Sequence, residues 1–233
     1  MNRLKSRIPD DFFKGIIILK NKIATDSYHL KIQSRDFSKL PYATGQTVEF
    51  ILNDPYSDVQ KEVRRYPFWD YESVHHMADF VIITLLHDSE NEWIQNVREG
   101  DAVFFRRSSE IIIINYTGDH YFLIGNVKAL PYLYEINRVL PVSKRIMSLV
   151  YAEKQENIFP DLDHSFPLQS FIENPLQAER IIESVITTFS DKTRNTIIYL
   201  FGDSEINALL ADYFNNPAFH IQLVYLKISK VNC

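Results

Sequence analysis

The stretch that decides the fold is Arg64-Arg65-Tyr66-Pro67, which lies within a run of alternating polar and apolar residues, 62–71. Alternation with a period of two predicts a β-strand, and it places Arg64 and Tyr66 on the same face. An apolar run, residues 79–86, predicts the next strand. Further along, residues 121–131 predict a strand that enters a helix after Gly125. The three segments therefore predict a strand, then a second strand followed by a loop, and later a third strand that leads into a helix.

The first half of the chain is rich in short apolar alternations. They predict strands over residues 15–20, 28–33, 47–53, 64–70, 79–86, 102–106 and 110–115, with a short helix at 93–97. About six or seven short strands at this spacing are typical of a small antiparallel barrel.

From residue 121 onward, strands alternate with helices. Strands are predicted at 143–152, 196–201 and 221–229, and helices from Leu130, from the Asn174-Pro175 pair and over 204–215, with a long loop at 155–171. Such alternation predicts an open parallel sheet flanked by helices. The predicted fold class is therefore α+β, with an antiparallel barrel domain at 1–116 and an α/β domain at 117–233.

Composition narrows the functional class. The 233 residues are 45% hydrophobic and 13% aromatic, enough for a packed core, and the net charge of −5 lacks the basic excess of a nucleic-acid binder. The single cysteine excludes an intrachain disulfide. There is no signal-peptide pattern and no apolar run long enough to span a membrane, so a cytoplasmic protein is predicted. The six glycines include no G-x-G-x-x-G, which disfavours a dehydrogenase-type dinucleotide fold.

The order of these motifs resembles the siderophore-interacting branch of the ferredoxin-reductase-like flavoproteins over nearly the whole chain. In that family the strand motif reads Arg-x-Tyr-Ser/Thr, and the later helix is entered through Gly-Asp-Glu-Thr-Ala-Leu-Pro, matched here at Ala129-Leu130-Pro131. The resemblance implies an FAD-binding barrel followed by an NAD(P)-binding domain. It implies an FAD-dependent oxidoreductase that uses NADPH or NADH to reduce ferric iron held by a siderophore, or another small electron acceptor.

The same resemblance implies a set of cofactor-binding residues. An arginine on a strand offers a rigid fork of donors to a phosphate, and a tyrosine two residues later can lie beside a flavin ring. The implied flavin-binding residues are Arg64, Arg65, Tyr66, Pro67, His87 and Asn91. Those implied for the nicotinamide cofactor are Gly125, Asn126, Ala129, Gly202, Asp203 and Glu205.

Several of these positions depart from the family pattern. Pro67 has neither the hydroxyl nor the N–H of the usual Ser/Thr. The loop after residue 86 carries Asp88, Glu90 and Glu92 where the family has Gly-Pro-Ala-Ser, and these charges would repel a diphosphate. The Arg106-Arg107 pair is a candidate substitute as phosphate ligand. The alternative function is a degenerate, flavin-poor relative that acts as a binding or regulatory protein.

Simpler interpretations also remain open. Arg64 and Tyr66 can be an exposed charge and a half-buried aromatic on an edge strand, where proline is tolerated. The loops at Gly125 and Gly202 follow strands and open helices, which suits a phosphate but also any strand-to-helix turn. The His75-His76 pair has no third ligand at a useful spacing, so no metal site is predicted.

Overall fold

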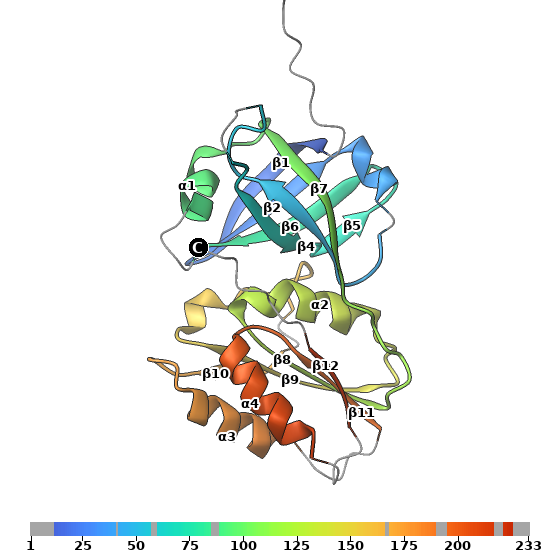
Figure 1. Ribbon diagram of the computed structural model, residues 1–233, viewed down its shortest axis with the longest axis vertical. Coiled ribbons are helices and arrows are strands. Elements are labelled where there is room, and N and C mark those ends of the chain that lie inside the picture. The colour runs from blue at the N-terminus through green and yellow to red at the C-terminus, as the bar shows by residue number, and fades with distance from the viewer. Residues whose placement is uncertain are drawn as a thin grey trace, which may run out of the picture. The chain divides into compact units, whose positions relative to one another are not determined.

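The computed structural model describes residues 12–40, 42–56, 60–84, 89–165, 168–189, 195–216 and 221–225. The chain divides into two compact units, Met1–Ile112 and Ile113–Cys233 (Figure 1). The first contains a seven-stranded antiparallel sheet and the second a five-stranded parallel sheet with helices. The predicted fold class is therefore confirmed.

The first unit is one antiparallel sheet with the strand order β4-β3-β7-β1-β2-β6-β5. Its strands are β1 (Phe13–Ala24), β2 (Ser27–Gln33), β3 (Gln46–Ile51), β4 (Val63–Pro67), β5 (Asp70–Glu72), β6 (Met77–Ile83) and β7 (Ala102–Ile111). A 3-10 turn, η1 (Arg35–Lys39), follows β2, and the helix α1 (Ser89–Asn96) precedes β7. Cross-strand neighbours such as Ile17 and Ile32 are fully buried together.

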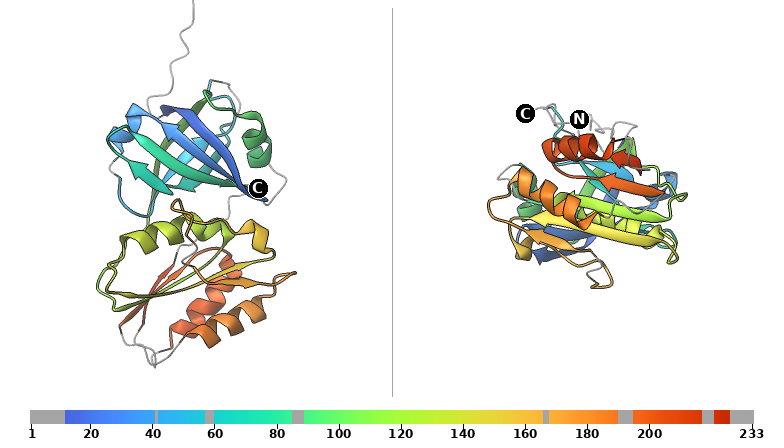
Figure 2. Two further views of the ribbon diagram at one scale, coloured as in Figure 1. Left: turned by 180° about the vertical axis from the view of Figure 1, so that it is seen from behind. Right: turned by 90° about the horizontal axis from the view of Figure 1, so that it is seen from below.

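The two edges of this sheet are joined by a single stretch of chain. β4 and β5 lie at opposite edges, yet only Phe68 and Trp69 separate them in the sequence. The Phe68 N–H donates to the Gln46 carbonyl at 3.2 Å, and the Trp69 N–H donates to the Asp79 carbonyl at 2.8 Å. The sheet therefore curls into a barrel, visible from behind in Figure 2.

Aromatic side chains fill the barrel interior. The buried rings include Phe37, Phe50, Tyr66, Phe68, Phe80 and Phe105. Phe37 stacks on Phe105 with ring centroids 4.8 Å apart. Each such ring removed from water contributes about 1.5–3 kcal/mol, so the alternating apolar positions explain why the strands close on one another.

The second unit has the parallel strand order β10-β9-β8-β11-β12. Its strands are β8 (His120–Asn126), β9 (Arg145–Ala152), β10 (Ser170–Ile172), β11 (Thr196–Leu200) and β12 (Ile221–Tyr225). Its helices are α2 (Leu130–Val139), α3 (Ala178–Thr188) and α4 (Ser204–Phe214), with 3-10 turns η2 (Val127–Ala129) and η3 (Gln155–Asn157). All five residues of β11 are buried, as expected of a strand covered on both faces.

Helices cover both faces of this parallel sheet. α3 and α4 pack on one face, where Phe122 and Ile124 cluster with Ile181 and Leu210 (Figure 1). α2 covers the other face (Figure 2), where its Tyr132 stacks on the ring that follows β11. The amphipathic helices thus hold the carboxyl ends of β8 and β11 in place beside the starts of η2 and α4.

Several boundaries in the first unit differ from the sequence prediction, among them β1, which is longer than the predicted 15–20, and β6, which ends at Ile83. The strand predicted over 64–70 is broken at Phe68 and Trp69, because the chain there passes from one edge of the sheet to the other. The strands predicted at 102–106 and 110–115 are one strand, β7, which ends at Ile111. The helix predicted at 93–97 begins at Ser89, since Glu90 and Glu92 in its first turn complement the helix dipole.

Two boundaries in the second unit also differ. α3 begins at Ala178 rather than at the Asn174-Pro175 pair, because the Glu173 N–H still bonds to Ala152 of the sheet at 3.1 Å. The loop predicted at 155–171 contains η3 and the start of the edge strand β10, which is too short to produce a readable alternation. The predicted strand residues 226–229 lie outside the described residues.

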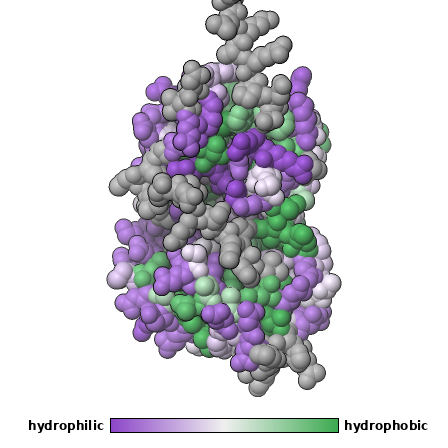
Figure 3. Space-filling model, in the orientation of Figure 1, coloured by the Kyte–Doolittle hydropathy of each residue, from purple (hydrophilic) through white to green (hydrophobic). Residues whose placement is uncertain are grey.

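The surface is mixed in character. In Figure 3 hydrophilic side chains cover much of the visible face, with smaller apolar patches between them. Among the described helices, none combines the length and the hydropathy needed to cross a bilayer.

Candidate functional site

Arg64 and Tyr66 leave the same face of β4, the face that lines the barrel. Arg64 lies opposite Phe50 and Tyr66 lies opposite Val48 on β3, and both β3 residues are fully buried. Directly opposed residues of an antiparallel pair share a face. Tyr66 is only 4% exposed, and its ring lies 5.0 Å from that of Phe50. Tyr66 is therefore part of the hydrophobic core and shares a face of β4 with Arg64.

Each polar group of this pair contacts a glutamate of the same unit. The Tyr66 hydroxyl donates to the carboxylate of Glu90 in the first turn of α1. The Arg64 guanidinium donates through Nη2 to Glu62 at 3.2 Å and through Nη1 to the Val63 carbonyl at 3.3 Å. The donor groups that would hold a phosphate thus already contact carboxylates. The carboxylate oxygens take the same kind of position that phosphate oxygens would occupy.

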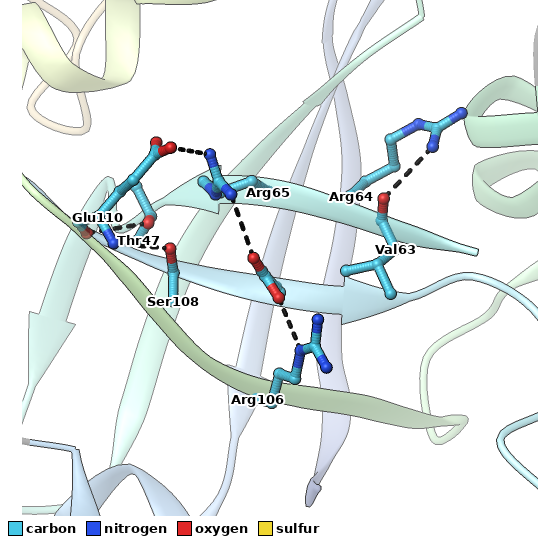
Figure 4. A network of polar contacts seen from close by, with 8 residues as sticks. Thr47, Val63, Arg64, Arg65, Arg106, Ser108 and Glu110 are labelled. Carbon is cyan, nitrogen blue, oxygen red and sulfur yellow. Dashed lines mark hydrogen bonds and ion pairs between the residues drawn. The ribbon is translucent and has the colours of Figure 1, made fainter. Parts of the chain in front are cut away.

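Arg65 lies on the opposite face of β4 from Arg64. It pairs with Glu49 at 3.2 Å and also with Glu110, while Arg106 donates to the second oxygen of Glu49 at 2.6 Å (Figure 4). Two arginines and two glutamates thus form a charge-balanced group across β4, β3 and β7. Arg65 and Arg106, considered from the sequence as phosphate ligands, are held here by carboxylates, whereas Arg107 is exposed.

Pro67 shares the face of Arg65 rather than that of Tyr66. It lies opposite Thr47, and both residues are buried. The Thr47 hydroxyl donates to the Glu110 carbonyl at 3.2 Å, close to the charged group just described. The missing N–H of Pro67 costs the sheet little, because β4 is an edge strand.

The segment between β6 and α1 is only partly described. His87 and Asp88 lie outside the described residues. Residues 89–91, predicted as part of a loop, belong to the first turn of α1. Asn91 is half-buried, and Glu92 is exposed. Of the two of these carboxylates that the structure describes, Glu90 and Glu92, it is Glu90 that contacts the Arg-x-Tyr strand.

In the second unit, the predicted residues gather at the carboxyl ends of two adjacent strands. Gly125 and Asn126 end β8, Gly202 follows β11, and β8 pairs directly with β11. A Cβ atom on Gly202 would lie 2.8 Å from Asn126 Cγ and 2.9 Å from the Tyr151 hydroxyl. Gly202 also has a φ of +112°, which a glycine adopts readily. The two loops therefore touch, and a side chain at Gly202 would push them apart.

A similar close approach occurs at Gly125. A Cβ atom there would lie 2.6 Å from Ala129 Cβ and 3.0 Å from the Phe201 carbonyl. Gly125 and Ala129 together let η2 approach the end of β11. Small residues at these positions are explained by packing alone.

Both helical starts are capped by side chains of the chain itself. Asn126 accepts from the Lys128 N–H at 3.0 Å. Asp203 accepts from the Glu205 and Ile206 N–H groups at 2.9 and 3.1 Å. The Asp203 N–H donates to the Tyr151 hydroxyl at 3.2 Å, and burial raises the pKa of that hydroxyl, so it stays neutral. Glu205 is exposed beside this cap.

Sequence reasoning missed the partners of the predicted residues. The sequence pattern does not mark Glu49 or Glu62 as partners, although Glu49 alternates outward between Val48 and Phe50. Tyr151 lies in a predicted strand, and no local signal connects it to Gly202. Strand register brings Glu49 to Arg65, and the order of strands in the sheet brings Tyr151 to Gly202, whereas Glu62 lies only two residues from Arg64 in the sequence.

Among the residues that the structure describes, no metal centre accompanies this site. Within the described part of the chain, no group of three or more His, Cys, Asp or Glu residues is arranged to hold an ion. His75 contacts Glu72 at 2.8 Å, and His76 lies in the same turn.

Sequence comparisons and structural comparisons give different results. No family model and no curated protein matches the sequence. Among solved structures, the siderophore-interacting protein from Acinetobacter baumannii is similar over 94% of this chain and 92% of its own, with a TM-score of 0.75 and 13% identity. The siderophore-interacting protein SipS from Aeromonas hydrophila is similar over 92% and 91%, with a TM-score of 0.74 and 13% identity.

A third similar structure is of a protein that is not described as siderophore-interacting. Phthalate dioxygenase reductase, a protein of electron transfer from pyridine nucleotides to [2Fe-2S], is similar over 93% of this chain and 68% of its own, with a TM-score of 0.71 and 12% identity. The expected resemblance is thereby confirmed in three dimensions. The chain has the two-unit fold of the siderophore-interacting proteins and of the ferredoxin-reductase-like flavoproteins.

Proposed function

We propose that this chain is a divergent flavin-dependent oxidoreductase that uses NADPH or NADH and reduces ferric iron held by a siderophore. The observation that carries the proposal is Arg64 and Tyr66 on one face of β4, with Tyr66 in contact with the first turn of α1. This pair occurs in a fold shared with siderophore-interacting proteins over nearly the full chain. Bound FAD would supply the electron transfer, while the protein supplies binding and orientation.

The residues fit the phosphate part of FAD in chemistry, with one condition. Arg64 carries the donor fork that a phosphate requires, and its side chain is 24% exposed. For FAD to bind, a phosphate oxygen must replace the Glu62 carboxylate at the Arg64 guanidinium. Glu90 must then either stay close to the ligand or move away from it. Tyr66 supplies a ring that is held by Phe50, and its small exposure restricts it to edge or partial contact with a flavin.

The iron chemistry follows from ligand preference. A siderophore holds Fe(III) through hard oxygen ligands, and one-electron reduction gives Fe(II), which such ligands hold less tightly. The proposed product is therefore released iron. NADPH or NADH would bind at the loops of Gly125 and Gly202, where N–H groups at helix starts favour anionic groups.

A second candidate function is favoured by the glutamate contacts. Because Arg64 and the Tyr66 hydroxyl each contact a carboxylate, the site resembles one whose cofactor has been replaced by side chains. A flavin-poor relative that keeps the fold for binding or regulation would have this arrangement. Flavin content distinguishes the two candidates directly.

The test is FAD titration of the purified full-length chain, followed by flavin absorbance and fluorescence. Arg64→Ala removes a charge-assisted contact, so FAD should bind about ten- to a hundredfold more weakly. Arg65→Ala is the matched control, because the same residue change on the opposite face of β4 should leave FAD affinity unchanged. Wild-type protein that binds no FAD at micromolar concentrations would favour the second candidate.

NAD(P)H oxidation with a ferric siderophore tests the activity itself. The FAD-loaded wild type should oxidise NADPH or NADH and produce Fe(II), trapped by a chromogenic chelator. FAD binding without this turnover would retain the flavoprotein assignment and contradict the proposed substrate.

A further inference from the structure

A pocket of about 550 Å³ lies in the wall of the first unit, built by β1, the end of β2 and the turn between β5 and β6. Its lining includes Lys14, Arg35 and His76 together with the apolar Ile16 and Val74. The volume lies within the range of roughly 300–1,000 Å³ found for small-molecule sites. None of its lining residues belongs to the Arg-x-Tyr strand.

Hydrogen bonds hold the three walls of this pocket together. The Ser34 N–H donates to the His76 carbonyl at 2.9 Å, and the Gln33 side-chain amide donates to the His75 carbonyl at 3.2 Å. The Ser34 hydroxyl donates to the Lys14 carbonyl at 2.6 Å. The pocket is therefore formed by backbone segments that hydrogen bonds connect, rather than by a gap between side chains alone.

The cations of the pocket differ from most others in this unit. The Lys14 ammonium and the Arg35 guanidinium have no hydrogen bond or ion pair within the part of the chain that the structure describes. The neighbouring carboxylates are engaged: Asp36 pairs with Lys39 at 2.6 Å, and Glu72 contacts His75 at 2.8 Å. By contrast, Arg64, Arg65 and Arg106 all contact glutamates. The lining thus holds two cations against one carboxylate, Asp36, which already pairs with Lys39, so the pocket carries net positive charge.

His76 also lines this wall. Its Nδ1 is buried and has no hydrogen-bond partner among the described residues. Its backbone lies in the left-handed region, with a φ of 54°. Because protein atoms enclose Nδ1, a ligand in the pocket would contact the remainder of His76 rather than this nitrogen.

We propose that this pocket binds a small phosphorylated molecule with an apolar group. Lys14 and Arg35 offer two separate cationic donors, and a phosphate monoester, with three acceptor oxygens and a charge of about −1.5 to −2, complements them better than a carboxylate. Ile16 is 38% exposed and Val74 is 77% exposed, and these apolar side chains provide contact for the remainder of the ligand. The site is independent of the proposed flavin and nicotinamide sites.

Calorimetric titration of the full chain with phenyl phosphate and with inorganic phosphate tests the proposal. The wild type should bind phenyl phosphate saturably and more tightly than inorganic phosphate. Arg35→Gln should weaken phenyl phosphate binding about tenfold or more, because it removes a charge-assisted contact. Arg145→Gln, at an exposed arginine of the second unit, is the matched control and should leave binding unchanged.

The imidazole of His76 gives a second, local measurement. Its ring resonances in the NMR spectrum, assigned by their loss in His76→Gly, should move on saturation with phenyl phosphate. The variant suits the left-handed backbone of position 76 and should keep the fold. Absence of saturable binding, equal weakening in Arg145→Gln, or unmoved His76 resonances would each overturn the proposal.

Discussion

The two units present their candidate anion-binding groups in different ways. On β4 the donors contact charged glutamates, with Arg64 on Glu62 and Tyr66 on Glu90. At the ends of β8 and β11, the N–H groups are capped by Asn126 and Asp203. A cap satisfies only some of the free N–H groups at a helix start, whereas a carboxylate beside an arginine opposes an incoming phosphate by its charge. Asn126 caps without a charge, whereas Asp203 brings a carboxylate to the second unit as well, so charge opposes an anion on β4 and at the start of α4 but not at the start of η2.

The largest expected effect concerns the contact between the two loops of the second unit. Gly202→Ala should destabilise the protein by about 2–4 kcal/mol, because it combines left-handed strain with a Cβ that meets Asn126 and Tyr151. Gly100→Ala is the matched control, since Gly100 also has a positive φ but no atom within 4 Å of the added Cβ. Chemical unfolding followed by circular dichroism measures both. Equal losses of stability in the two variants would mean that the contact between the loops does not contribute to the effect of Gly202→Ala.

The next effect tests the carboxylate on the flavin side. Glu90→Gln should strengthen FAD binding severalfold at low salt, because it removes a negative charge next to Tyr66, and the gain should shrink as salt increases. Glu92→Gln, at an exposed position of the same helix, should change FAD affinity less. Fluorescence titration at two ionic strengths gives the comparison. An equal gain in FAD affinity for both variants would show that Glu90 does not oppose FAD more strongly than Glu92 does.

The contact between Tyr66 and α1 should also stabilise the apo protein. Tyr66→Phe removes the hydroxyl that donates to Glu90, at a cost of about 1–2 kcal/mol. The ring and its packing on Phe50 remain, so the barrel core is preserved. Denaturant unfolding without flavin measures the difference. In Glu90→Gln the same substitution should cost less, and an unchanged cost would show that the two side chains do not interact.

A similar loss is expected at the helix cap in the second unit. Asp203→Ala should cost about 1 kcal/mol, because two N–H groups of α4 lose their acceptor. Asn126→Ala should cost less, since Asn126 caps a single N–H of a short turn. Thermal unfolding compares the two variants. If Asn126→Ala were the more destabilising change, Asn126 would have a packing role against Gly202 that outweighs its cap.

The smallest effect concerns the charged group on the outer face of β4. Glu49→Gln should change stability by no more than about 1 kcal/mol, because the arginines it contacts are partly exposed and solvent screens the pairs. FAD affinity should stay the same, since Glu49 lies on the opposite face from Arg64. An altered affinity would show that the outer face contributes to the flavin site.

The sequence determined the class of each unit and the face on which each motif residue lies. Both follow from local periodicity: a strand alternates every second residue, so Arg64 and Tyr66 share a face whatever the tertiary structure. The same rule placed Arg65 on the other face, although the family resemblance grouped it with Arg64. The alternation of strands and helices after residue 120 likewise specified a parallel sheet before any contact was known.

Only the tertiary structure decided which groups those residues meet. Arg65 finds Glu49 and Glu110 through the pairing of β3 with both β4 and β7, and Tyr66 finds Glu90 only because α1 follows β6 against the barrel. The break at Phe68 and Trp69 likewise arises because one stretch must join both edges of a closed sheet. Strand register and barrel closure depend on the packing of the whole core, and a local pattern of residues carries no measure of that packing.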